Sequence, residues 1–232
     1  MEPTLNKPRG RWWKTAFYAV LTLLAIFLVA FGFYVLDLVK KQNNKTLDEN
    51  TILTQLEQYK TSAENETITG TDNYWLGAAK PKITIVEFGD FNCSNCKNSF
   101  SNIREISLKY KDSVKIIFRD FPILTNSSNL ALAGRCAGEQ GLFWVMHDKL
   151  FSNQGNFEIS QLPELANQIG ADVNKFTSCL NSEKYTSKIN KDYADGKSLG
   201  ITGTPIWFIN GYKIEGDIPH DLFIQIVEEL IK

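Results

Sequence analysis

The chain has 232 residues, with 25 lysines and arginines against 26 aspartates and glutamates and a formal net charge of -1. This near balance excludes a protein that binds nucleic acid through an excess of positive charge, so we expect no nucleic-acid partner. The length allows one good-sized domain with additional segments. The 15 Phe, 8 Tyr and 5 Trp are enough to fill a hydrophobic core.

An apolar segment over residues 16–36 contains no charged residue. As a helix it would be about 30 Å long, which is the thickness of the hydrocarbon core of a bilayer. Basic residues precede it, namely Lys7, Arg9, Arg11 and Lys14. Because such flanks stay in the cytoplasm, we predict a single-pass signal anchor in the cell membrane, with residues 1–15 cytoplasmic and the catalytic part of the chain in the periplasm or on the outer face.

The two alternatives to a membrane anchor are a cleaved signal peptide and a buried core helix. A cleaved signal peptide has a shorter apolar region, of about 7–15 residues, and ends at a small-x-small site. Ala30-Phe31-Gly32 is a poor version of that site and lies inside the apolar run. A buried core helix fits poorly, because the segment is uniformly apolar and stands alone before a polar stretch. With an anchor or a signal peptide, the rest of the chain is exported.

A polar stretch over residues 37–73 is predicted to be a tether. It is rich in Lys, Asn, Thr, Glu and Gln and contains no proline. As a flexible coil it would reach on the order of 30 Å. The folded domain is expected to occupy residues 74–232.

The hydrophobic pattern of this domain predicts an α/β fold. A strand over 83–88, a helix over 93–110 and a strand over 114–118 form a β-α-β unit, whose strands are parallel. A helical insertion follows over about 126–198, with breaks near Gly141, Gly155, Gly170 and Asn181. The remaining predicted elements are a strand over 206–209, a turn at Asn210-Gly211, a strand over 212–214 and a helix over 219–231.

The chemistry is carried by Cys93-Ser94-Asn95-Cys96, which lies between the first predicted strand and the helix after it. This placement puts Cys93 at a helix N-terminus, where backbone N–H groups and the helix dipole stabilise a thiolate. A thiolate is the species that attacks disulfides. We therefore predict a thiol–disulfide oxidoreductase in which Cys93 is the nucleophile and Cys96, one turn further on and more buried, resolves the mixed disulfide.

A zinc site and a purely structural disulfide are the alternatives for this motif. Zinc sites of this type use two C-x-x-C pairs, whereas this chain has one such pair and only two histidines, His147 and His220. A disulfide between Cys93 and Cys96 would close so short a loop that it would constrain the unfolded chain little. We accordingly expect a redox-active disulfide, no metal and no cofactor.

The motif and its surroundings resemble the DsbA-like family of thiol:disulfide oxidoreductases. The resemblance covers about residues 75–232 and rests on four stretches, Val86-Glu87-Phe88-Gly89-Asp90-Phe91-Asn92-Cys93-Ser94-Asn95-Cys96, Phe118-Arg119-Asp120-Phe121-Pro122, Gly134-Arg135-Cys136-Ala137 with the residues after it, and Gly200-Ile201-Thr202-Gly203-Thr204-Pro205. It implies a thioredoxin fold with a helical domain inserted between its second and third strands.

Three further site residues follow from the resemblance. Pro205 is similar to the cis-proline that faces the C-x-x-C motif in this fold, with Thr204 offering its backbone to an extended client. Glu87 resembles the buried acid that moves the proton of the second cysteine, and its apolar strand makes a raised pKa plausible. The alternative for Glu87 is an exposed position on the strand.

Asp90 is expected to organise the loop, and His147 to pack or form hydrogen bonds.

The sequence departs from the best-known oxidase pattern, which has Pro-His where this chain has Ser94-Asn95. Losing that histidine removes one stabiliser of the Cys93 thiolate, so the site is expected to be less oxidising than the family's extreme members. Thr204 before the proline also occurs in isomerase-like relatives. These departures leave the direction of electron flow open.

Cys136 and Cys179 both lie in the predicted helical insertion. Exported chains favour disulfides, and four cysteines allow three pairings. Since Cys93 and Cys96 pair with one another, a structural Cys136–Cys179 disulfide is the prediction, which the chain-entropy model values at about 4 kcal/mol. The alternative is a second, regulatory redox pair.

The function predicted from these residues is donation of the Cys93–Cys96 disulfide to exported protein thiols. The resemblance implies a membrane partner of the DsbB or vitamin-K-epoxide-reductase type that reoxidises the pair. Two alternatives are a reductase or isomerase kept reduced by a membrane electron donor, and a client-binding chaperone module without redox turnover.

Overall fold

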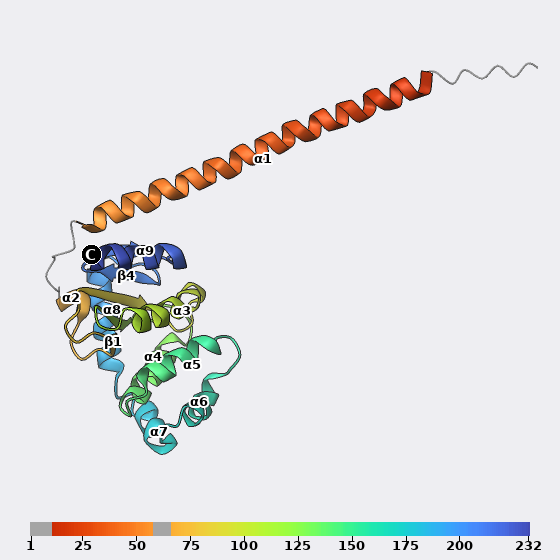
Figure 1. Cartoon of the computed structure of the whole chain (residues 1–232). Coiled ribbons are helices and arrows are strands. Elements are labelled where there is room, and N and C mark those ends of the chain that lie inside the picture. The colour runs from red at the N-terminus through yellow and green to blue at the C-terminus, as the bar shows by residue number, and fades with distance from the viewer. Residues whose placement is uncertain (1–10, 58–65) are drawn as a thin grey trace, which may run out of the picture. The chain divides into compact units, whose positions relative to one another are not determined.

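The computed structural model describes residues 11–57 and 66–232, and its contacts divide the chain into two units (Figure 1). The first unit contains most of helix α1 (Arg11–Glu57). Within α1, Ala16–Lys40 is long and apolar enough to cross a membrane, and no part of it is buried against other described residues. A helix that is apolar on all sides suits a lipid environment. The described part of the chain thus holds one candidate membrane span, where the sequence predicts the anchor.

The tether predicted over residues 37–73 is wrong at both of its ends. Helix α1 continues to Glu57, well past the apolar segment. Residues 37–57 contain neither proline nor glycine, so no strong breaker stops the helix. The short helix α2 (Glu66–Thr69) already belongs to the folded domain. Residues 58–65 of the predicted tether, like residues 1–10, lie outside the described residues.

Helix α2 is attached to the domain by one buried side chain and one buried cation. Ile68 is 8% exposed and packs in the same cluster as Val86 and Phe88 of the sheet. The Arg119 guanidinium donates hydrogen bonds to the carbonyl oxygens of Thr67, at 3.1 Å, and of Ile68, at 2.8 Å. The domain therefore begins before the predicted boundary at residue 74.

The domain is built on a five-stranded mixed sheet in the order β1-β3-β2-β4-β5. β2 and β3 run parallel, and the other neighbouring strands are antiparallel. The strands are β1 (Trp75–Gly77), β2 (Ile83–Gly89), β3 (Val114–Asp120), β4 (Ile206–Ile209) and β5 (Tyr212–Glu215). The sequence predicts all of these except β1, which at three residues is too short to show an alternating pattern.

The central strand β2 is buried along its whole length, as its nearly continuous apolar sequence predicts for a strand covered on both faces. Val86 and Phe88 point to one face, together with Ile206 and Phe208 of β4. Glu87 points to the other face, beside Trp207, which contacts Phe223 of helix α9 (His220–Ile231). Helix α3 (Ser94–Lys109) packs against α9 and covers this second face.

Five helical segments between β3 and α8 form the inserted part, and they gather at one end of the domain (Figure 1). They are α4 (Ser127–Gly138), α5 (Phe143–Ser152), the 3-10 segment η1 (Ile159–Gln161), α6 (Leu162–Gln168) and α7 (Val173–Asn181). The predicted breaks at Gly141, Gly155 and Gly170 are confirmed, and each of these glycines has a positive φ, which side chains disfavour. Their core is continuous with Cys93 and Cys96.

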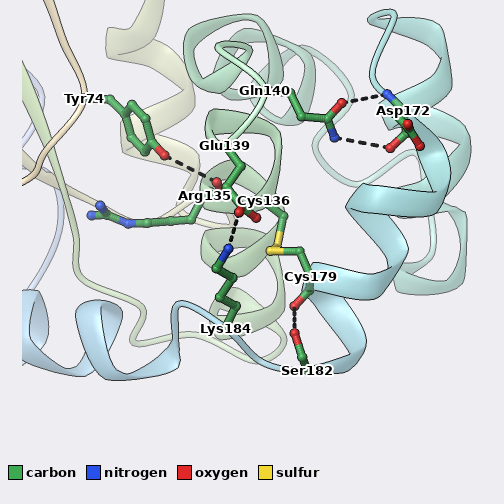
Figure 2. The surroundings of a disulfide bond; sticks show 9 residues. All are labelled: Tyr74, Arg135, Cys136, Glu139, Gln140, Asp172, Cys179, Ser182 and Lys184. Atoms are coloured by element: carbon green, nitrogen blue, oxygen red, sulfur yellow. Dashed lines mark hydrogen bonds and ion pairs between the residues drawn. A yellow bond between two sulfur atoms is a disulfide. The ribbon is translucent and has the colours of Figure 1, made fainter.

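A disulfide joins Cys136 of α4 to Cys179 of α7, with the two Cα atoms 5.7 Å apart (Figure 2). A second link lies nearby, where the side-chain amide of Gln140 donates to the carbonyl of Asp172 at 3.2 Å and accepts from its N–H at 2.7 Å. The contact between α4 and the α7 segment therefore rests on polar side chains as well as on the disulfide.

The predicted insertion, residues 126–198, extends one helix too far. Helix α8 (Thr186–Ser198) packs against β3 and α2, so it is a layer of the sheet domain. Tyr193 stacks on Phe121 with ring centroids 4.9 Å apart. A Cβ atom at Gly196 would lie 2.7 Å from the Phe121 ring, so glycine permits this close approach. The prediction missed the role of α8 because this helix buries charge where an apolar stripe would normally lie.

The buried charge of α8 is Asp192, which is fully buried and shared by three cations. Its carboxylate accepts from Arg119 of β3 at 2.8 Å, from Arg135 of α4 at 2.5 Å and from Lys188 of its own helix at 2.5 Å. Arg135 also donates to Asp120 at 2.6 Å. This network, formed by Arg119, Asp120, Arg135, Lys188 and Asp192, connects the sheet, the inserted helices and α8.

Candidate active site

The two cysteines of the C-x-x-C motif lie where β2 gives way to α3. Cys93 is the N-cap residue of α3 and has extended backbone angles, φ -81° and ψ 125°. Cys96 occupies the first turn of the helix. Both are free thiols, and Cys93 is 9% exposed while Cys96 has no exposed surface. Cys93 is accordingly the sulfur that a partner in solution can reach.

The surroundings of Cys93 favour its thiolate and lower its pKa to about 5. The largest cause is a hydrogen bond from the Cys96 thiol, and burial opposes it. Thr204 and the backbone N–H groups of Cys96 and Asn95 lower the pKa further. These N–H groups belong to the first turn of α3, where no side chain caps the helix and the donors are free to face an anion.

The second sulfur and the acid behind it are held in their neutral forms. Burial raises the pKa of Cys96 well above its usual value, and the neighbouring Cys93 and Glu87 raise it further. Glu87 is 1% exposed, and burial together with the negative charge of Cys93 raises its pKa to about 8. Its Oε1 atom has no hydrogen-bond partner among the described residues. The protonated Glu87 carboxyl therefore lies beside the buried Cys96 thiol.

A cis peptide bond between Thr204 and Pro205 lies opposite the motif, in the loop before β4. In its neutral form, the Cys93 thiol donates a hydrogen bond of 3.3 Å to the Thr204 carbonyl oxygen. The Thr204 hydroxyl is buried and has no hydrogen-bond partner in the described part of the chain, and the Thr204 side chain lowers the pKa of Cys93. All five residues predicted for the redox site are therefore brought to one place, namely Cys93, Cys96, Glu87, Thr204 and Pro205.

Comparisons with known proteins identify the family to which this fold belongs. The sequence profile of the thioredoxin family matches residues 69–229. The chain belongs to the thioredoxin family. The thiol-disulfide exchange protein alpha-DsbA2 of Wolbachia pipientis is 25% identical, with a TM-score of 0.65 over 79% of this chain and 98% of that protein. BdbD of Bacillus subtilis is 26% identical, with a TM-score of 0.61 over 68% of this chain and 92% of that protein.

These similarities confirm the predicted DsbA-like thioredoxin fold. Curated relatives differ in their overall organisation. The Na(+)/H(+) antiporter NhaA 1 of Salinispora arenicola is 31% identical over 144 residues, which are 60% of this chain and 22% of the antiporter. NhaA 3 of Salinispora tropica is 29% identical over 143 residues, with the same coverage. The matched part of this chain corresponds to about a fifth of the length of each of these antiporters.

Asp90 organises the loop that precedes Cys93, as the sequence suggests. Its Oδ2 accepts from the backbone N–H groups of Ile123, at 2.8 Å, and Leu124, at 3.1 Å. Its Oδ1 accepts from the N–H of Asn92 and from the Ser127 hydroxyl, at 2.8 and 2.5 Å. This thioredoxin-family site is therefore fixed to the start of α4 by a single buried carboxylate.

His147 lies within the inserted core and contacts the rings of Phe91, Phe118 and Phe151, with centroids 5.6, 5.1 and 4.9 Å away. Burial lowers its pKa, and its Nδ1 atom lies 3.0 Å from Asp148. It is a packing residue, as predicted.

The sequence does not single out Gln154, whose amide donates to the backbone of the Cys93 loop, because no local pattern marks a contact between residues 61 positions apart.

Glu87→Gln is expected to stabilise the reduced protein at alkaline pH. In the unfolded chain this carboxyl ionises near pH 4.5, whereas in the fold its pKa is about 8. The folded state therefore loses stability as pH rises from about 4.5 to 8, and the loss stays constant above that range. Urea unfolding should show equal stability near pH 4 and an advantage for the variant on the order of 5 kcal/mol at pH 9.

The exposed Glu228→Gln is the control for the loss of a carboxylate, and its difference from the parent should be flat between pH 5 and 9. A Glu87→Gln difference that is equally flat would show that this carboxyl ionises normally in the fold.

Proposed function

We propose that this chain is an extracytoplasmic disulfide donor, which transfers the Cys93–Cys96 disulfide to exported proteins. The observation that carries the proposal is the low pKa of Cys93 beside the raised pKa of Cys96. Stabilising the Cys93 thiolate stabilises the reduced form of the pair, and a pair whose reduced form is stable is a strong oxidant. The N–H groups of α3, the Cys96 thiol and Thr204 together take the place of the histidine that this motif lacks.

Transfer proceeds through a mixed disulfide. A client thiolate attacks Cys93 Sγ, the Cys93–Cys96 bond breaks, and the electron pair leaves on the Cys96 sulfur, which takes up a proton. A second client thiolate then attacks the client sulfur of the mixed disulfide and releases Cys93 as a thiolate. The low pKa of Cys93 makes it a good leaving group in this step. The client is oxidised by two electrons and the Cys93–Cys96 pair is reduced by two.

Glu87 is assigned the proton that Cys96 gains or loses. It is the acid beside this buried sulfur, and with a pKa of about 8 it can exchange a proton near neutral pH. Thr204 and Pro205 are assigned to the client's backbone, because an extended peptide beside Cys93 can pair with the backbone of the half-buried Thr204. The Cys136–Cys179 disulfide is assigned a structural role, since it joins two inserted helices away from the reacting pair.

The membrane segment supports an anchored enzyme with its catalytic domain outside the cytoplasm. The basic residues before α1's apolar stretch favour a cytoplasmic N-terminus. An exported disulfide donor needs an oxidant to regenerate it, and a membrane redox protein of the DsbB or vitamin-K-epoxide-reductase type would supply one. In that step the Cys93 and Cys96 thiols give two electrons and two protons to the partner's disulfide or quinone.

The test is the direction of transfer between the full chain in detergent and a reduced client peptide with two thiols. The oxidised chain should convert one equivalent of client to its disulfide at neutral pH, with the chain recovered reduced. A reductase or isomerase would instead leave the client reduced and, in its own reduced form, open the client's disulfide. Client binding without any change in redox state would favour a chaperone module.

A further inference from the structure

One side chain from the inserted helices reaches the backbone of the cysteine loop. Gln154 follows the end of α5, and its Nε2 amide donates to the carbonyl of Phe91 at 2.9 Å and to the carbonyl of Cys93 at 3.0 Å. An amide NH₂ carries two hydrogens, so both of its donors are used. The side chain thus bridges the two carbonyls on either side of Asn92.

A second hydrogen bond runs in the opposite direction, from α3 to the backbone of Gln154. Lys97, in the first turn of α3, places its ammonium 3.5 Å from the carbonyl oxygen of Gln154. Gln154 and Lys97 therefore link the active-site loop and the α5 segment in both directions. A cavity of about 80 Å³ adjoins this link, lined by Phe91, Asn92 and Gln154 among others. Side-chain hydrogen bonds therefore hold the loop beside this cavity.

The position of the Cys93 carbonyl decides which backbone groups face the reactive sulfur. This carbonyl also accepts from the N–H of Lys97 at 3.1 Å, which is the first hydrogen bond of the α3 ladder. It is therefore directed along the helix, away from the N–H groups of Asn95 and Cys96 that stabilise the thiolate. If the carbonyl turned, its negative end would approach the sulfur and the N–H groups would lose their alignment.

We propose that Gln154 is a positioning residue for the exchange reaction, which fixes the Cys93 carbonyl and so keeps the N-terminus of α3 aligned on the reactive sulfur. Gln154 does not touch the sulfur and acts through the backbone. The inserted helices would then contribute to the reactivity of the cysteine pair as well as to the shape of the domain. This inference rests on the proposed role of Cys93 as nucleophile.

The test compares Gln154→Leu and Gln154→Glu with the parent chain in detergent. Leucine has no donor, and glutamate has the same shape but carries acceptors where the amide carries donors. We expect both variants to raise the pKa of Cys93 by about one unit, the size of effect that loss of one hydrogen bond to the site allows. Alkylation by iodoacetamide, followed against pH in a Cys136→Ser/Cys179→Ser background, should be slowed about fivefold at pH 5.

The exchange equilibrium provides the second readout. Loss of thiolate stabilisation disfavours the reduced form, so the equilibrium with glutathione should move about tenfold toward the protein disulfide, equivalent to about 30 mV. Gln140→Leu is the matched control, because Gln140 makes a similar two-bond contact to the backbone at Asp172, remote from Cys93 (Figure 2). It should leave both the alkylation profile and the glutathione equilibrium at the parent values.

The inference is overturned if the Gln154 variants keep the parent's pH profile, or if Gln140→Leu shifts that profile equally. Failure of the proposed role of Cys93 as nucleophile looks different, because the parent chain itself would then show no pH-dependent Cys93 reactivity and no exchange with glutathione, whereas a reductase would show both and differ only in the direction of transfer to the client. A fall in thermal stability shared by Gln154→Leu and Gln140→Leu, without a change in the pH profile, would assign Gln154 a structural role only.

Discussion

Cys93→Ser is expected to abolish disulfide exchange, whereas Cys96→Ser should stop it halfway. Without the Cys93 sulfur no thiolate is accessible, because Cys96 is completely buried and the pKa of its thiol is raised. Without Cys96 the Cys93 thiolate still attacks a client disulfide, but no second sulfur releases the product. Incubation with a disulfide-containing client, followed by non-reducing electrophoresis, should show no adduct for the first variant and a stable adduct for the second.

The double variant Cys136→Ser/Cys179→Ser serves as the control for the loss of a cysteine pair. It should retain exchange, because its sulfurs lie in α4 and α7 and take no part in the reaction. An adduct in Cys93→Ser, together with loss of exchange in this control, would place the exchange on the second pair and contradict the assignment.

Asp192→Asn is expected to be the most destabilising single substitution outside the cysteine site. Asp192 is the common partner of Arg119, Arg135 and Lys188, and the two arginines are almost completely buried. Removing its charge leaves the buried network with one more positive than negative charge, because among the described residues Arg119 keeps only Asp195 and Arg135 only Asp120, and this imbalance costs about 3–5 kcal/mol. The midpoint of urea unfolding, followed by tryptophan fluorescence of the full chain in detergent, should fall accordingly.

Glu228→Gln provides the matched control at the surface. Glu228 accepts from Lys109 at 3.2 Å, and both side chains are about half exposed. Such pairs contribute little, so the unfolding midpoint should barely change. Equal losses for Asp192→Asn and Glu228→Gln would show that the buried network does not hold the sheet, the inserted helices and α8 together.

The redox site could be predicted from the sequence because its signals are local. Cys93 and Cys96 are separated by two residues at a strand-to-helix junction, and Gly203-Thr204-Pro205 precedes a strand. The breaks at Gly141, Gly155 and Gly170 were equally predictable, because positive φ angles select glycine. Each of these features depends on a few neighbouring residues and on rules that hold without knowledge of the tertiary fold.

The features that the sequence did not reveal depend on contacts between distant residues. The charged residues of helix α8, Asp192 among them, look like a solvated helix face in the sequence, whereas Asp192 lies in the core through pairing with Arg119 and Arg135. Helix α2 lies within the predicted tether, because its attachment to the domain depends on a buried arginine from β3, a contact that the local sequence does not show. Charges of opposite sign that neutralise one another inside a fold look like an ordinary solvated surface in the sequence.

The reduction potential of the Cys93–Cys96 pair, measured on the full chain equilibrated with glutathione buffers, tests the central claim most directly. The low pKa of Cys93 predicts a value between about -180 and about -120 mV, at which the reduced form is the more stable one and the disulfide passes to clients. A value near about -270 mV would make the disulfide the stable form, contradict a donor, and assign the enzyme to the reduction of its clients.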